Sequence, residues 1–310
     1  GRAGMDLYAD PPGTQVEHTT GFYATIGGSS GNIAVGLARH GLCASLLTCV
    51  SNDAVGRFVV RELKNFGVDT SHIVALDGEM RTSLAVTETR IEDTQNTLYR
   101  NNAADLMLSE EHVSAVAFDS YDALIVTGTA LAVPPSRMAT LGAMRSAGDA
   151  GAFVVLDLDY RPYSWQSADE AAEVYGAAAG LSDLVVGNDD EFAVMANGDH
   201  ALGRDLAARL GKQGKTVIYK MGEKGSVAFT HDEEFSTGIF PVNALKPMGA
   251  GDAFMASLMA GLTTGASLKE AVRNGSAAAA MVVSRIGCAP AMPTTTELNE
   301  FIEHQSAMPA

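Results

Sequence analysis

The sequence predicts an α/β protein with a doubly wound, mostly parallel sheet flanked by helices, and two observations carry this prediction. Short runs rich in Val, Ile and Leu are typical of strands buried on both faces, and they span residues 44–50, 122–128, 152–158, 183–188 and 216–222. Helical apolar patterns lie around and between these runs, over residues 30–40, 54–66, 110–117, 134–147, 167–179 and 199–211. Because strand and helix alternate, we expect parallel pairing through right-handed crossovers.

The pattern changes after residue 222. Segments 225–230 and 233–240 indicate antiparallel strands near one edge, and three helices are predicted over roughly 251–264, 267–284 and 294–305. Two other segments, 16–28 and 81–102, are rich in Thr and Tyr and predict a small projecting β-sheet. Ligands of α/β proteins bind beyond the carboxyl ends of the strands, so such a sheet would serve as a lid. No Pro/Gly/Ser-rich linker divides the chain, which predicts a single α/β domain over 1–310 with lid strands inserted at about 16–28 and 81–102.

Composition excludes several classes of protein. The formal net charge of −16 argues against a nucleic-acid partner, which would need a basic face. No uninterrupted apolar stretch reaches about 18 residues, so a membrane span is not expected. Three cysteines are too few for a disulfide framework, and buried reduced thiols in a cytoplasmic protein are expected. The first residues lack a signal-peptide pattern, a starting Met and an obvious first strand, so we expect the sequence to begin inside a natural chain.

The strongest local signal is the segment KPMGAGDAF at 246–254. Small residues let backbone N–H groups approach a ligand, and a helix N-terminus adds unsatisfied donors. The amides of Gly249, Ala250, Gly251 and Asp252 are therefore predicted to hold a γ-phosphate. A carboxylate beside that anion is unfavourable unless Asp252 takes a proton from an attacking hydroxyl. The alternative is that Asp252 caps the helix and the glycines only form a turn.

A second signal is GGSSGNIAVGLARHG at 27–41, in which Gly27 and Gly28 close a strand and Asn32 opens a helix. By itself this segment also fits a simple strand–helix turn. Neither GxxxxGK[ST] nor a kinase-type GxGxxG loop is present, so the two usual phosphate motifs are excluded, and with them a Rossmann dehydrogenase. From the residues alone, the prediction is phosphoryl transfer to a small hydroxylated acceptor.

These two segments resemble the two signature regions of the ribokinase-like (PfkB) carbohydrate kinases. The sequence also matches the family at Asp6, 157–165, 188–191, 220–226 and Asn274, and all the matches occur in the same order along the chain as in the family. The resemblance implies a ribokinase-like fold, ATP as phosphoryl donor, Mg²⁺, and a homodimer formed through the lid strands. Exposed strand edges are natural pairing surfaces, which agrees with such a dimer.

Four segments of the sequence indicate a particular subgroup of this family. Segments 98–106, 157–165, 245–254 and 282–294 are similar to the sugar-acid kinases of inositol catabolism. This similarity implies phosphorylation of 5-dehydro-2-deoxy-D-gluconate at its 6-hydroxyl. A 2-keto-3-deoxygluconate kinase or a fructokinase of the same family is the alternative. A non-catalytic sugar-binding regulatory module is the alternative from another class.

The resemblance also assigns roles to individual residues. Asp252 is the expected base, with Gly249, Ala250 and Gly251 as the anion hole. Acceptor binding is expected from Asp6, Gly27, Gly28, Asn32, Arg100 and Arg161. The two arginines are candidates for the substrate carboxylate, because a guanidinium fork matches it, and ordinary ion pairs are the alternative. Nucleotide contacts are expected from Asn188, Lys220, Gly222, Gly225 and Asn274, and a water-mediated contact to Mg²⁺ from Glu191. Asn188 could equally cap the helix that begins there.

One position departs from the family pattern. Many relatives have Asp-Thr-x before the second signature, and that Asp helps to bind a monovalent cation. Here the stretch is Lys246-Pro247-Met248. A cation site with a lysine in place of its carboxylate is electrostatically unfavourable. If the Lys246 ammonium points inward, we expect it to replace the cation, whereas an exposed loop lysine is the alternative.

Overall fold

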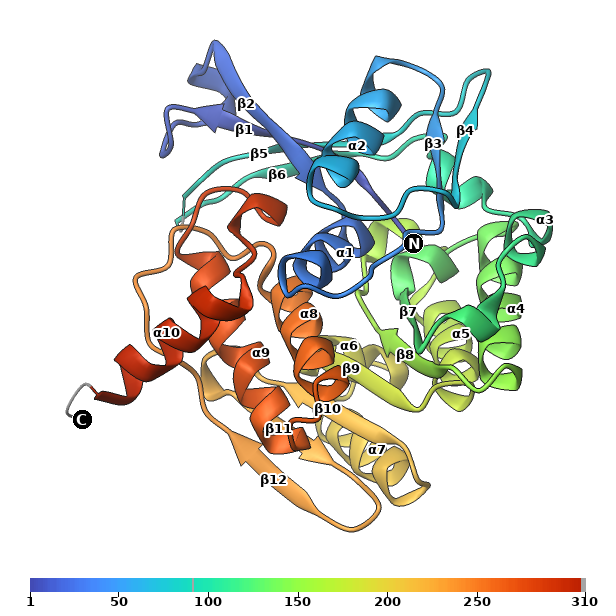
Figure 1. Cartoon of the computed structure of the whole chain (residues 1–310), viewed down its shortest axis with the longest axis vertical. Helices are drawn as coiled ribbons and strands as arrows, with labels where there is room; N and C mark the ends of the chain where they lie inside the picture. Colours follow the sequence, from blue (N-terminus) through green and yellow to red (C-terminus); the bar gives the residue numbers. More distant parts are fainter. Residues whose placement is uncertain (91, 308–310) are drawn as a thin grey trace. The chain divides into compact units, whose positions relative to one another are not determined.

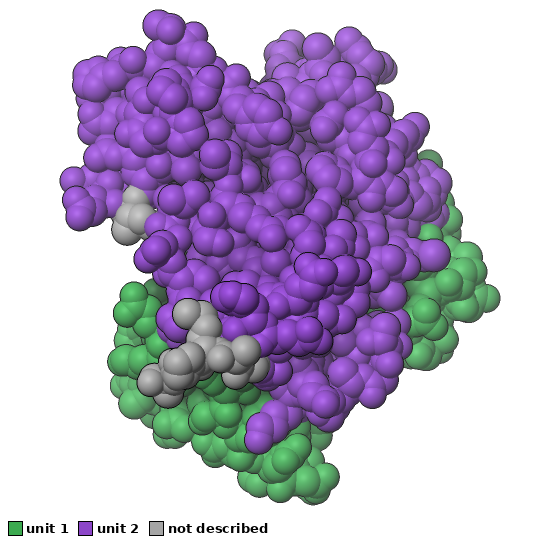
Figure 2. Space-filling view, turned by 60° about the vertical axis from the view of Figure 1, so that its left-hand side comes forward, with its two compact units in different colours: residues 1, 106–238 green, residues 2–105, 239–310 purple. Residues whose placement is uncertain are grey.

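The computed structural model describes residues 1–90 and 92–307, and the chain divides into two compact units (Figures 1 and 2). Unit 1 contains residues 1 and 106–238, and unit 2 contains residues 2–105 together with those from 239 onward. The single-domain organisation stays a prediction. No helix within the described residues is long and apolar enough to cross a membrane.

Unit 1 contains a six-stranded sheet in the order β12-β11-β10-β9-β8-β7 (Figure 1). Its strands are β7 (Ala123–Thr127), β8 (Phe153–Asp157), β9 (Leu184–Asn188), β10 (Thr216–Lys220), β11 (Ser226–Phe229) and β12 (Glu234–Thr237). Strands β7 to β10 are parallel, whereas β11 and β12 add antiparallel pairs at one edge. The four apolar runs and the antiparallel edge predicted for this region are confirmed.

The helices of unit 1 follow the predicted alternation. They are α3 (Glu110–Ser114), α4 (Ser136–Asp149), α5 (Ala168–Gly180), α6 (Asp189–Met195) and α7 (His200–Lys212). Helix α4 packs on β7 and β8, and α7 packs on β10 and β11. The strands are therefore covered and their side chains fully buried, as in Val155, Val186 and Ile218. A continuous apolar run is the expected sequence signature of such strands.

Unit 2 contains a four-stranded sheet in the order β2-β1-β5-β6. Its strands are β1 (Gly4–Asp10), β2 (Gly21–Gly27), β5 (Ser83–Thr87) and β6 (Asn96–Tyr99). The small sheet predicted from segments 16–28 and 81–102 is confirmed, except that residues Val16–His18 form a 3₁₀ turn before β2. The sequence showed no obvious first strand, and this interpretation was wrong. Strand β1 lies between β2 and β5 and pairs with both. Whether this sheet acts as a lid stays a prediction.

The apolar run at 44–50 does not join the six-stranded sheet. Its strand β3 (Thr48–Ser51) pairs in parallel with β4 (Ile73–Leu76) in a separate two-stranded sheet. At the last residue of β3, the Ser51 amide donates to Thr82 Oγ1 at 2.9 Å, and the Thr82 amide donates to Ser51 Oγ at 3.1 Å. Side-chain hydroxyls thus take over backbone hydrogen bonding where the short ladder ends, a device that apolar periodicity does not predict.

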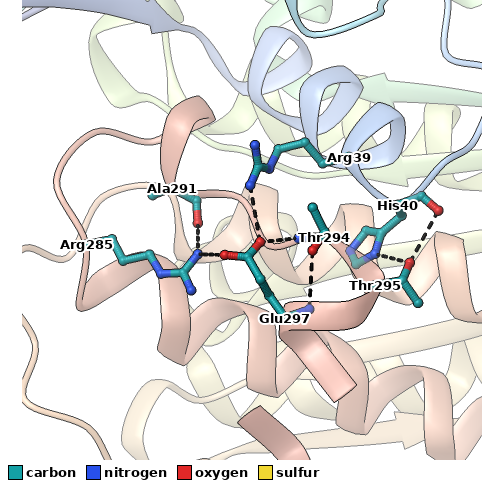
Figure 3. A network of polar contacts seen from close by, with 7 residues as sticks. All are labelled: Arg39, His40, Arg285, Ala291, Thr294, Thr295 and Glu297. Carbon is teal, nitrogen blue, oxygen red and sulfur yellow. Dashed lines mark hydrogen bonds and ion pairs between the residues drawn. The ribbon is translucent and has the colours of Figure 1, made fainter. Parts of the chain in front are cut away.

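The helices of unit 2 are α1 (Ser29–Arg39), α2 (Ala54–Asn65), α8 (Ala250–Thr263), α9 (Leu268–Val283) and α10 (Thr295–Ala307). Helix α8 packs against both α1 and α9. A polar network joins the end of α1 to the start of α10 (Figure 3). In it, Arg39 and Arg285 pair with opposite oxygens of Glu297 at 3.2 and 3.3 Å, and His40 contacts Thr295. This network links the end of α1 to the start of α10 and to Arg285, which follows α9.

The cysteines are all free thiols. Cys49 and Cys288 are buried as predicted, whereas Cys43 is exposed, which corrects the expectation for that residue. A thiol on the surface needs no apolar neighbours, so burial cannot be inferred from residue type alone. The cytoplasmic location stays a prediction.

Candidate active site

The segment singled out as an anion hole lies at the N-terminus of α8. Gly249 is the residue before the helix and has a φ of 85°, in the left-handed region that favours glycine. A Cβ added to it would lie 2.9 Å from the Cys288 sulfur. Ala250 and Gly251 open the helix, and Asp252 lies in its first turn. The first four amides of a helix have no partner within it, so this geometry suits an anion.

The second glycine-rich segment forms another helix start. Gly28 precedes α1 with a φ of 87°, and a Cβ added to it would lie 2.7 Å from the backbone oxygen of Arg2. A Cβ on Gly27 would lie 2.1 Å from the carboxylate of Asp6. Both positions therefore require glycine, which supports the prediction that bare backbone is needed here.

Close packing of α1 on α8 brings two predicted residues together. A Cβ on Gly36 would lie only 2.5 Å from the Ala256 methyl carbon, so the helix backbones approach closely at this level. One turn earlier on each helix, Asn32 Nδ2 donates to Asp252 Oδ2 at 2.7 Å. Within the described part of the chain, Asn32 Oδ1 is buried and has no hydrogen-bond partner. Asn32 thus orients the carboxylate, a contact that sequence reasoning missed, and its oxygen can accept from a bound hydroxyl.

Asp6 lies in the middle of the first strand, β1. Burial raises the pKa of Asp6 to about 6, although the positive charges of Arg2 and Lys246 and a hydrogen bond from the Tyr8 hydroxyl act in the opposite direction. At neutral pH, Asp6 is therefore mainly a buried carboxylate, which is a strong acceptor for hydroxyl groups.

Two other residues of unit 2, Arg100 and Asn274, are also predicted to bind ligands. Arg100 follows β6, and its guanidinium is 2.5 Å from Asp105, whose other oxygen accepts from Ser83. Only 6% of the Arg100 side chain is exposed, so the ion-pair interpretation fits this arginine well. Asn274 lies in α9, and a Cβ on Gly261 of α8 would be 3.4 Å from its amide nitrogen. The binding roles of both residues stay predictions.

Unit 1 gathers a second group at the carboxyl ends of β8, β9 and β10. Asn188 Oδ1 accepts from the Glu191 amide at 2.8 Å, and Glu191 Oε2 accepts from the Asn188 amide at 2.7 Å. This reciprocal capping box confirms that Asn188 caps α6. Glu191 Oε1 also accepts from the Tyr160 amide, so both carboxylate oxygens are engaged. Burial raises the pKa of Glu191, and the positive charge of Lys220 opposes this shift.

The donor set of Glu191 and Asn188 fits Mg²⁺ through water better than directly. Each Glu191 oxygen accepts one backbone hydrogen bond and keeps a second lone pair. Across the described residues, no three His, Cys, Asp or Glu side chains form a metal cage. Mg²⁺ usually keeps several waters and takes few protein ligands, so an outer contact through water is compatible with this geometry.

Arg161 differs from Arg100 in its exposure. It follows β8 and pairs at 2.6 Å with the buried Asp159, while 42% of its side chain is exposed. Asp159 has a φ of 37°, which turns the chain sharply after the strand. Sequence reasoning did not single out Asp159, although it lies in the motif at 157–165. Arg161 is thus held on one side and accessible on the other, as a carboxylate-binding residue requires.

The turn after β10, for which nucleotide contacts are predicted, also needs glycine. Gly222 and Gly225 follow β10 with φ values of 55° and 82°. A Cβ on Gly225 would lie 2.2 Å from the backbone oxygen of Thr237. The backbone of the turn at residues 220–226 therefore requires both glycines, and the nucleotide contacts of this turn stay predictions.

Comparison with known proteins decides the family, because the model of the pfkB family carbohydrate kinases matches residues 1–295. The chain belongs to this family. It is 42% identical to a 5-dehydro-2-deoxygluconokinase of Photobacterium profundum over 98% of this chain and 93% of that protein. A protein of Bacillus subtilis with the same name is 38% identical, over 99% and 95%. The chain is therefore an ATP-dependent carbohydrate kinase.

Solved structures agree with this assignment. A fructokinase of Xylella fastidiosa with bound ATP has a TM-score of 0.87 at 25% identity, and the match covers 99% of this chain and 97% of that chain. A Vibrio cholerae fructokinase double mutant with fructose, ADP and a potassium ion bound has a TM-score of 0.85 at 25% identity, over 97% and 96%. The ribokinase-like α/β fold is thus confirmed.

Proposed function

We propose that this kinase transfers the γ-phosphoryl group of ATP to the 6-hydroxyl of 5-dehydro-2-deoxy-D-gluconate. The names of relatives that are 38–42% identical over nearly the whole chain support this substrate. The observation that carries the chemistry is Asp252 in the first turn of α8, bonded to Asn32 and following the left-handed Gly249. A base beside a set of backbone donors is what phosphoryl transfer to a hydroxyl requires.

In the proposed phosphoryl transfer, every bond and proton is accounted for by ATP, the acceptor and these residues. The acceptor oxygen forms a bond to the γ-phosphorus, the bond from that phosphorus to the bridging oxygen breaks, and ADP leaves with the electron pair. The hydroxyl proton goes to the Asp252 carboxylate, of which Oδ2 also accepts from Asn32. Amides at Gly249, Ala250, Gly251 and Asp252 stabilise the charge on the equatorial oxygens.

Remaining roles are assigned by chemistry. Asp6 and the buried oxygen of Asn32 accept from sugar hydroxyls. Lys220 and the turn around Gly222 and Gly225 contact the nucleotide, together with Asn274. Mg²⁺ on the phosphates would neutralise their charge, and Glu191 and Asn188 would hold it through water.

A substrate panel tests the proposed specificity. The purified protein is incubated with ATP and, separately, 5-dehydro-2-deoxygluconate, 2-keto-3-deoxygluconate and fructose, and the phosphorylated products are identified by ³¹P NMR. The highest kcat/KM is expected for 5-dehydro-2-deoxygluconate. A higher value for either of the other acceptors would overturn the proposed substrate.

Arg161→Ala tests recognition of the acid. Loss of a charge-assisted contact to the carboxylate is expected to raise KM for the sugar acid by about 10-fold or more, with little effect on a neutral sugar. The matched control is Arg204→Ala, which removes another half-exposed arginine of unit 1 that pairs with an acid at 3.0 Å. Equal effects of Arg161→Ala on acidic and neutral acceptors would contradict carboxylate recognition.

Potassium should have little influence on the rate. Lys246 is fully buried, which confirms that it points inward, and its charge interacts with Asp6 and Asp252. Its ammonium already supplies the local positive charge near the anion hole. Nearly unchanged activity is expected when K⁺ is replaced by a bulky organic cation. Strong activation by K⁺ would show that Lys246 does not take this role.

We further propose a homodimer formed through β2 and β6. Both are edge strands of the four-stranded sheet, and they expose Phe22, Tyr23 and Tyr99 by 43%, 54% and 58%. Exposed edges with apolar side chains favour pairing with a second copy. Analytical ultracentrifugation should show a dimer that Phe22→Lys weakens. A monomer at all concentrations would contradict the proposal.

A further inference from the structure

Three buried polar side chains of unit 2 take no direct part in the transfer step, although the Lys246 charge lies near the proposed anion hole. Lys246 is fully buried, and Tyr8 and Cys288 are 2% and 3% exposed. Burial of an ammonium group is costly unless polar partners compensate for the lost water. Removal of such a group in favour of an apolar side chain often leaves stability unchanged or increased, so stability alone does not explain a lysine at this position.

These side chains lie within hydrogen-bonding distance of one another. Lys246 Nζ donates to the backbone oxygen of Met248 at 2.7 Å and lies 3.8 Å from the Cys288 sulfur. That sulfur lies 3.2 Å from the Tyr8 hydroxyl. The Tyr8 hydroxyl in turn hydrogen-bonds to Asp6, two residues earlier on the same face of β1.

The directions of these bonds are mutually consistent. The ammonium has only donors, and the Asp6 carboxylate has only acceptors. Burial raises the pKa of Cys288 to about 11, so the group is a thiol and can donate its own hydrogen. Lys246 therefore donates to Cys288, the thiol donates to Tyr8, and the hydroxyl donates to Asp6, with each group between the ends accepting one bond and donating one.

The two ends of this chain are the two places where the reaction needs accurate placement. At one end, Asp6 is the proposed contact to the sugar. At the other, the Met248 carbonyl immediately precedes Gly249, whose backbone packs against the Cys288 sulfur. The same ammonium thus holds the loop that enters α8 and the bond chain that leads to β1.

We propose that Lys246, Cys288 and Tyr8 are positioning residues that hold Asp6 and the anion-hole loop in one fixed geometry. The inference rests on the proposed function of Asp6 and of the amides that begin α8. In-line transfer needs the acceptor oxygen and the phosphorus at about 3–3.5 Å, and a misplacement of 1 Å costs about 100-fold in rate. A hydrogen-bond chain with one direction keeps both ends in register where apolar packing would leave them to move independently.

The experiment combines Lys246→Met, Tyr8→Phe and the double variant. Lys246→Met keeps length and apolar volume, and Tyr8→Phe removes only the hydroxyl. The charge control is Lys269→Met, which removes an exposed lysine of α9. For each protein, kcat, the KM for ATP and the midpoint of thermal unfolding are measured with the acceptor that the parent phosphorylates best. A parent that prefers another sugar contradicts the proposed substrate and leaves this test intact.

Each single variant is expected to lower kcat by about 10- to 100-fold, with the KM for ATP within about threefold of the parent and no matching loss of thermal stability. The double variant is expected to be no slower than the slower single one, because both changes break one chain. Tyr8→Phe combined with Lys269→Met should equal Tyr8→Phe alone. A parental kcat in either single variant, effects that multiply in the double variant, or losses of kcat that follow losses of stability would overturn the proposal. If Lys246→Met does not fold, the kcat, KM and unfolding midpoint of Tyr8→Phe decide it.

Discussion

Asp252→Asn is expected to lower kcat by about 10³-fold or more while folding and ATP binding stay close to those of the parent. The carboxamide oxygen can still accept the hydrogen bond from Asn32, which is 2.7 Å long in the parent, so the α1–α8 contact is kept. An amide cannot take the proton of the acceptor hydroxyl, so the loss falls on the chemical step. Steady-state kinetics, calorimetric titration with ATP and a thermal melt measure the three quantities separately.

The matched control is Asp169→Asn. Asp169 is an exposed acid at the second position of α5, and like Asp252, at the third position of α8, it lies in the first turn of its helix. Its loss changes the charge near a helix dipole without touching the proposed site, and parental kinetics are expected. If Asp252→Asn kept a parental kcat, or if it weakened ATP binding and stability as much as turnover, Asp252 would be a structural residue and not the base.

Gly249→Ala is expected to have the second largest effect, a loss of about 100-fold in kcat from removal of accurately placed donors. The new methyl group would lie 2.9 Å from the Cys288 sulfur, so the loop or the sulfur must move. The φ of 85° adds strain of about 1–2 kcal/mol for a residue with a Cβ. Kinetics and thermal unfolding of the same protein separate the catalytic effect from the loss of stability.

Gly265→Ala is the control that separates backbone strain at a positive φ from the steric clash of the added methyl group. Gly265 follows α8 with the same φ of 85°, but no atom lies within 4 Å of the position of an added Cβ. Both variants should lose similar stability through the backbone, whereas only Gly249→Ala should lose activity. A comparable loss of kcat in Gly265→Ala would mean that general destabilisation, and not the displaced anion hole, accounts for the result.

Local features of the sequence predicted most of the fold. The apolar runs of β7 to β10 are readable because strands covered on both faces need consecutive apolar residues. Strand β1 was missed, since it mixes Asp6, Tyr8 and small residues, and its pairing partners come from residues 21–27 and 83–87. Such a strand is defined by its neighbours in the sheet, and its own composition carries little information about them.

The candidate site also has features that the sequence predicted and features that only the structure revealed. Sequence patterns alone determined the two glycine-rich helix starts and Asp252, because a left-handed turn and an acid in a first helical turn have strong local residue preferences. Only the tertiary structure decided that Asn32 holds Asp252, that Arg100 is engaged by Asp105 while Arg161 stays accessible, and that Lys246 points inward. Asn32 and Asp252 are 220 residues apart in the chain. Their contact depends on how closely α1 and α8 pack at Gly36, and no local propensity encodes the distance between two helices.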